Sequence, residues 1–155
     1  MLPLDELYSD FEKLAVIERP VGRPPSATDV ERAESSLQRR IPVDFVHFLC
    51  RFCNRTPPFW DVLRVQPAGS TPVAEDIVTE NLLHRQEYPH ELRNCLLFRN
   101  CGTGSYDCFV YSPSGELLGI ANWDPFDDDR EIPPKVLHDT WADWLSGEVR
   151  RLRRV

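Results

Sequence analysis

The sequence has no long hydrophobic run. In its 155 residues, no stretch approaches the roughly 18 uncharged apolar residues that a membrane-spanning helix needs. Residues 1–14 carry acids and lack both the basic leader and the apolar segment of a signal peptide. Internal repeats, low-complexity tracts and heptads are also missing. We therefore expect a single cytoplasmic domain over residues 1–155, with no membrane partner and a core that needs no disulfides.

The sequence also lacks the motifs that mark common catalytic and cofactor sites. Residues 102–104 (Gly-Thr-Gly) lack the third glycine of a dinucleotide fingerprint and the Gly-Lys-Ser/Thr ending of a P-loop. The four histidines show no i, i+4 metal-binding spacing, and neither Ser105 nor Ser112 lies in a Gly-x-Ser-x-Gly elbow. We expect no catalytic residue, no cofactor and no bound metal. A small metal- or thiol-dependent enzyme is a third hypothesis, which metal analysis and a free-thiol count would test.

The chain has five cysteines, an odd number, so at least one cannot be in an intramolecular disulfide. Reduced thiols are expected in a chain with no secretory leader. Cys50 and Cys53 form a CxxC, the spacing that brings two thiolates to one zinc ion. No second CxxC follows, and Phe48, Leu49 and Phe52 surround the pair on an expected helix. We favour cysteines that act as small hydrophobic core residues, with a zinc site as the alternative.

Acidic residues outnumber basic ones by 25 to 18, which gives a formal net charge of −7. Four of the positive charges belong to Arg150, Arg151, Arg153 and Arg154, and without them the charge would be −11. Such a body repels nucleic acid and attracts basic partners. The arginine tail fits the last turn of a helix, whose dipole favours cations, although a small nucleic-acid anchor is an alternative.

Apolar residues at spacings of three and four predict helices in the first third of the chain. The expected buried faces are Leu4, Leu7, Phe11 and Leu14; then Val30, Ala33 and Leu37; then Phe45, Phe48, Leu49 and Phe52. Residues 1–25 form the first helix and a proline-rich connector. Thr28 and Glu31 predict a capping box for the second helix. Pro42 suits the first turn of the third, which we expect to end near Asn54.

The second half of the chain has the pattern of a β-meander. We expect a strand over residues 59–65 and a helix from Thr71-Pro72 to about Gln86. The later strands are expected at residues 96–98, 106–111 and 116–123, with turns at 101–105 and 112–115. A last helix carries Trp141, Trp144, Leu145 and Val149. This order predicts an α+β fold in which helices wrap an antiparallel or mixed sheet.

The most unusual stretch is residues 124–131, where five acids fall within eight residues. It lacks the alternating ligands, central glycine and distal glutamate of an EF-hand, although a metal site stays an alternative. A second alternative is that residues 124–131 form a solvated loop with no binding function. Phe126 among the acids favours a partner-binding loop, because interfaces combine aromatic anchors with a charged rim. The predicted partner-binding residues are Asp124, Phe126, Asp127, Asp128 and Asp129, together with Trp60, Asp61 and Asp107.

Three segments, in order, resemble the SUKH superfamily, which includes fungal cell-wall-synthesis regulators and bacterial immunity proteins against polymorphic toxins. The first runs from Thr28 to Arg39 and into Ile41-Pro42-Val43-Asp44-Phe45. The second is residues 97–107, with its glycine turn and Asp107. The third is residues 139–145, similar to the closing Ser-Phe-x-Glu-aromatic-Leu helix of the family. The resemblance covers residues 29–145, and it departs from the family at Arg55, where the family usually has glycine.

The resemblance implies an α+β fold, no catalysis, and a role as an inhibitor bound to a toxin domain. An acidic body suits a basic partner, such as a nuclease whose substrate charge it would imitate. The alternative is a regulatory or scaffold module with an intracellular partner and no toxin. Gene context separates the two, because a toxin gene directly upstream favours immunity.

Overall fold

The computed structural model describes residues 3–14, 23–52, 61–70 and 75–154. Within these ranges the order of elements along the chain is α1 (Leu4–Leu14), α2 (Ala27–Leu37), α3 (Val43–Arg51), β1 (Asp61–Val62), α4 (Ile77–Glu87), β2 (Cys95–Asn100), β3 (Tyr106–Tyr111), β4 (Leu117–Trp123), β5 (Val136–His138) and α5 (Trp141–Leu152). No helix of this described part is long and apolar enough to cross a membrane.

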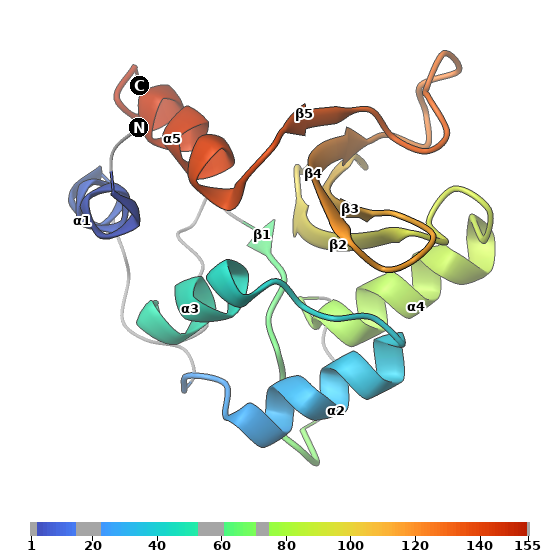
Figure 1. Cartoon of the computed structure of the whole chain (residues 1–155), viewed down its shortest axis with the longest axis horizontal. Helices are drawn as coiled ribbons and strands as arrows, with labels where there is room; N and C mark the ends of the chain where they lie inside the picture. The colour runs from blue at the N-terminus through green and yellow to red at the C-terminus, as the bar shows by residue number, and fades with distance from the viewer. Residues whose placement is uncertain (1–2, 15–22, 53–60, 71–74, 155) are drawn as a thin grey trace.

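The strands form one sheet in the order β1-β2-β3-β4-β5, and every neighbouring pair is antiparallel. In Figure 1, α4 lies below the sheet, and α3 and α5 lie to its left. All six residues of β3 are buried, because this central strand is covered on both faces. The predicted α+β fold is confirmed, and of the two predicted sheet types the antiparallel one is observed.

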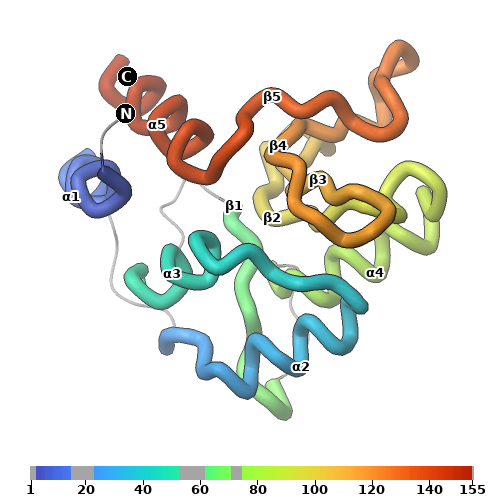
Figure 2. Tube along the Cα trace, viewed as in Figure 1, coloured from blue at the N-terminus to red at the C-terminus, as the bar shows by residue number. Residues whose placement is uncertain are grey.

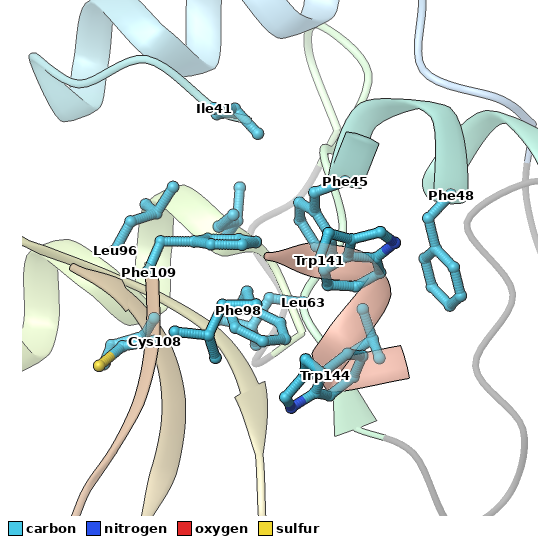
Figure 3. Packing of buried hydrophobic residues seen from close by; sticks show 14 of the residues in the cluster. Ile41, Phe45, Phe48, Leu63, Leu96, Phe98, Cys108, Phe109, Trp141 and Trp144 are labelled. Carbon is cyan, nitrogen blue, oxygen red and sulfur yellow. The ribbon is translucent and has the colours of Figure 1, made fainter. Parts of the chain in front are cut away.

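Aromatic side chains fill the space between the sheet and helices α3 and α5. The rings of Phe98 and Phe109, on adjacent strands, stack at 4.4 Å between centroids (Figure 3). Phe45 of α3 lies 5.5 Å from Phe98, and Trp141 and Trp144 of α5 stack at 4.7 Å. Each such buried side chain contributes roughly 1.5–3 kcal/mol. The aromatic faces predicted from helical spacing therefore form the main core.

The α4 side of the sheet is held by a buried amide. Asn81 of α4 is 1% exposed, and it donates to the carbonyl of Leu97 and accepts from the Leu97 amide, both at 2.8 Å. The register slips between Leu97 and Arg99, so this strand position is not fully paired with its neighbour. A buried backbone group without a partner costs about 1–3 kcal/mol, and Asn81 removes that cost. It thereby fixes α4 on the sheet.

Several features differ from the sequence prediction, and within the described part of the strand expected over 59–65, β1 comprises only Asp61–Val62. The capping box of α2 uses Ser26 and Asp29 in place of Thr28 and Glu31, because the helix already begins at Ala27. Asp76 caps α4 by accepting from the Thr79 amide, whereas the predicted cap at Thr71 lies outside the described residues. Strand β5 was not predicted at all, since three residues are too few to show an alternating pattern.

Asp29 stabilises the start of α2 with its carboxylate, which is 4% exposed. The Ser26 amide, which donates to Asp29 Oδ2 at 3.0 Å, is the largest of several causes that lower the pKa of Asp29 from 3.8 to about 2. A depressed pKa means that the stabilisation is present above the ordinary Asp pKa and is lost as the pH falls through about 2.

The substitution Asp29→Asn is therefore expected to lower the free energy of unfolding at pH 7 by about 1 kcal/mol. The difference from wild type should shrink as the pH falls from 4 towards 2. Chemical denaturation at several pH values measures this effect. Glu87→Gln, at the exposed end of α4, is the matched control and should have no effect at any pH. A destabilisation that persists unchanged at pH 2 would contradict the assignment.

Candidate protein-interaction surface

The acidic loop, defined as residues 124–131, connects β4 to β5 and extends beyond the sheet at the upper right of Figure 2. Phe126 is 75% exposed, the largest exposure among the large hydrophobic side chains of the described residues. Asp127, Asp128 and Asp129 are all exposed, and Asp124 is half-buried. The predicted anchor and the run of acids therefore lie on the surface together.

Two aspartates of the acidic loop fix its backbone. Asp124 Oδ1 accepts from the Phe126 amide at 2.9 Å, and Asp127 Oδ1 accepts from the Asp129 amide at 3.0 Å. Aspartate favours such turns because its side-chain oxygen can accept a hydrogen bond from the amide two residues further on, which mimics a backbone turn. The carboxylates of Asp128 and Asp129 make no hydrogen bond to the rest of the described chain. These two charges are free to meet a partner.

Glu91, which follows α4, anchors the loop from outside. Its carboxylate accepts two hydrogen bonds from Arg130, Nε to Oε2 at 2.9 Å and Nη2 to Oε1 at 2.8 Å. It also accepts from Trp123 Nε1 at 2.8 Å. Arg130 Nη1 in turn donates to the Asp127 carbonyl at 2.9 Å. We call Glu91, Trp123 and Arg130 the Glu91 bracket.

The hydrogen bonds of the Glu91 bracket favour the ionised form of the Glu91 carboxylate. The Glu91 side chain is 11% exposed. The hydrogen bond from Arg130 is the main cause that lowers the pKa of Glu91, and the bond from Trp123 adds to it. Bidentate arginine–carboxylate pairs fix orientation better than a single contact does. The bracket therefore holds both ends of the acidic loop, Trp123 before it and Arg130 within it.

The Phe126 ring packs against the turn between β2 and β3. A Cβ added to Gly104 would lie 2.6 Å from the Phe126 ring, which is closer than real Cβ contacts come. Gly104 also has φ +88, a conformation that favours glycine. One edge of the ring thus lies against the backbone of Gly104 while most of its area faces solvent. The turn and the acidic loop together position this aromatic side chain.

The other predicted contacts are not part of this surface. Trp60 lies outside the described residues, and Asp61 is placed only as the first residue of β1. Asp107 is 7% exposed. Its Oδ2 accepts from Arg99 Nε at 2.7 Å and from Trp144 Nε1 at 3.1 Å, and its Oδ1 accepts from Asn122 at 3.1 Å. The structure places Asp107 in the interior, where it neutralises Arg99, and not on an exposed surface.

Glu91 and Gly104 were missed by sequence reasoning. Glu91 is 39 residues from Arg130 and 32 from Trp123, so no local pattern connects them. Gly104 was read as part of a turn, and nothing in the sequence shows which side chain covers it. The one available signal was Arg130 itself, a single cation within the acidic run.

Four of the five cysteines lie within the described residues. Cys95 and Cys108 are buried on neighbouring strands, and Cys50 and Cys101 are half-buried. Burial raises the pKa of the Cys101 thiol, which works against a reactive thiolate there. Cys53 lies outside the described residues, so the CxxC hypothesis stays a prediction. Among the described side chains, no three His, Cys, Asp or Glu residues gather closely enough to hold a metal ion.

The substitution Arg130→Ala is expected to loosen the acidic loop without unfolding the domain. The amides of Asp129 and Arg130 are bonded within the loop, and their hydrogen exchange should accelerate by about tenfold or more when the bracket is broken. Hydrogen exchange followed by NMR measures each amide. Lys135→Ala, at an exposed cation beyond the loop, should leave these rates unchanged. Equal rates in wild type and Arg130→Ala would show that the bracket does not order the loop.

A scan against protein-family models finds no match for this chain, and neither does a search of curated proteins. The SUKH resemblance therefore stays a prediction that rests on the segments quoted above.

Proposed function

We propose that this protein is a non-catalytic binding domain that captures a basic protein partner through the acidic loop. The observation that carries the proposal is the pairing of a 75% exposed Phe126 with the exposed Asp127, Asp128 and Asp129 on a loop held by the Glu91 bracket. An exposed aromatic ring gives binding energy when a partner buries it, and surrounding charges give orientation.

Preorganisation supports this function over a plain solvated loop. A solvated loop needs no fixed conformation, whereas this one has two internal aspartate turns, a bidentate ion pair and a seat for its aromatic ring. Order that exists before binding reduces the conformational entropy lost on association. The overall charge of −7 acts in the same direction, because it attracts a basic partner at long range.

The partner that best fits these features is a basic toxin domain, with this protein as its cytoplasmic immunity protein. The SUKH resemblance and the acidic composition both support that identification. A nuclease is a suitable toxin, because a surface that binds a phosphate backbone is positively charged and would accept the carboxylates of the loop. Inhibition would follow from occlusion and needs no chemistry from this chain.

Affinity purification of the tagged protein from its native host, with mass spectrometry of retained proteins, tests the proposal. We expect one dominant basic toxin domain at near-equal stoichiometry, retained by wild type and recovered in smaller amount with the Phe126→Ala variant. A single housekeeping partner retained through the same loop would favour the regulatory or scaffold alternative. Recovery of the same proteins in equal amounts by wild type and Phe126→Ala would remove the Phe126 anchor from the account.

A further inference from the structure

A second surface feature lies at the other end of β4. A groove of about 250 Å³ lies between the start of α3, the start of β4 and the start of α5. Its interior consists of the buried residues Phe109, Ile120 and Trp141. Two exposed apolar side chains also line it, Val43 at 68% and Leu117 at 44%. The groove is therefore an apolar concavity whose wall is left open to solvent.

Two carboxylates border the groove. Asp44 in the first turn of α3 and Asp139 before the N-cap of α5 are both exposed, and no basic residue is among those that line the space. Neither carboxylate makes a hydrogen bond or ion pair with the described residues. The two helix N-termini each contribute about +0.5 of a charge, so about −1 remains from the two carboxylates. The sign of the groove is negative.

The size of the groove decides what class of ligand fits. Small-molecule and cofactor sites usually enclose about 300–1,000 Å³, so a space below that range suits one or two side chains. Its apolar floor favours an aliphatic side chain, and the negative border favours a cation beside it. We propose that this groove docks a protein segment in which an aliphatic residue is flanked by lysine or arginine.

This site is separate from the acidic loop. The groove includes Leu117 at the start of β4, and the acidic loop follows Trp123 at its end. Strands rise about 3.3 Å per residue, so Leu117 lies about 20 Å along β4 from Trp123, and Ile120, which also lines the groove, lies about 10 Å from it. A basic protein could therefore contact the domain at two points. The proposal for the groove does not depend on the proposed function of the acidic loop.

The test is an NMR titration of the full chain with the peptide acetyl-Lys-Leu-Lys-amide. We expect chemical-shift changes centred on residues 43–44 and 117–120, with a dissociation constant of about 1 mM. The peptides acetyl-Lys-Gly-Lys-amide and acetyl-Glu-Leu-Glu-amide should bind at least about tenfold more weakly, because each lacks one half of the complementarity. Equal binding of the Gly peptide, or shifts centred on the acidic loop, would overturn the proposal.

Substitutions at the groove give a second readout. Val43→Lys and Leu117→Lys place a cation at exposed positions of the lining, so the fold should tolerate both and the spectrum itself reports folding. Each should weaken the Leu peptide by about tenfold or more. Leu137→Lys, on β5 at 60% exposure and outside the lining, is the matched control and should leave affinity unchanged. Undiminished binding by both groove variants would refute the site.

Discussion

The substitution Asp107→Ala is expected to lower the free energy of unfolding by about 3 kcal/mol, because it leaves a buried cation short of a partner. The side chain of Arg99 is 13% exposed, and its guanidinium lies between Asp107 and Glu148. Burial opposes its charge, and these two carboxylates more than offset that effect and raise the pKa of Arg99. The variant also removes the acceptor for the Trp144 indole and for the Asn122 amide.

Denaturant titration of Asp107→Ala beside Asp128→Ala measures this difference. Asp128 is an exposed carboxylate of the acidic loop, and its loss should change stability by no more than about 0.5 kcal/mol. The pair therefore separates a structural aspartate from a surface one. Equal stability of the two variants would mean that the Arg99 network contributes little to the stability of the fold.

The substitution Phe126→Ala is expected to weaken binding to the captured partner by about 30-fold, which corresponds to about 2 kcal/mol. The side chain is 75% exposed in the free protein, so its removal should leave stability unchanged. Its loss should increase the dissociation rate, because an aromatic anchor acts after the encounter and not during it. Surface plasmon resonance with the purified partner gives both rate constants.

Ile132→Ala is the matched control for that measurement. Ile132 follows the acidic loop and is 57% exposed, and it is not among the side chains nearest to any described glycine, whereas Phe126 packs on Gly104. We expect a change in affinity of less than about threefold for the control. An equally small change for Phe126→Ala would remove the aromatic anchor from the account while leaving the charges to be tested separately.

Much of the fold could be predicted from local pattern. Helical spacing identified the buried faces of α1, α2, α3 and α5, since apolar residues three and four apart must share one side of a helix. The turn at residues 112–115 was predicted from its proline and glycine, and the Gly115 amide donates to the Ser112 carbonyl at 2.9 Å. Strand β5 was missed also because its position depends on its contact with β4, which local sequence pattern does not show. A Cβ on Gly119 would lie 2.5 Å from the His138 carbonyl, so β5 packs where only glycine leaves room.

Only part of the candidate site could be predicted from the sequence. Composition pointed to Phe126 and the aspartates that follow it, because an aromatic ring within an acidic run is unusual. The Glu91 bracket could not be read, since it joins residues more than 30 positions apart. Asp107 was also predicted as a contact residue, but it is 7% exposed in the fold. Its burial depends on Arg99, Asn122 and Trp144, which meet only in the folded chain.

The dependence of the association rate on salt tests the central claim most directly. Stopped-flow or surface plasmon resonance measurements would compare wild type with the triple variant Asp127→Asn, Asp128→Asn, Asp129→Asn, using the captured partner over a range of ionic strength. The account predicts that wild-type association is at least about tenfold faster at low salt and falls steeply as salt is added, while the variant, whose net charge is −4, associates more slowly and depends less on salt. An unchanged association rate in the triple variant at low salt would contradict the account.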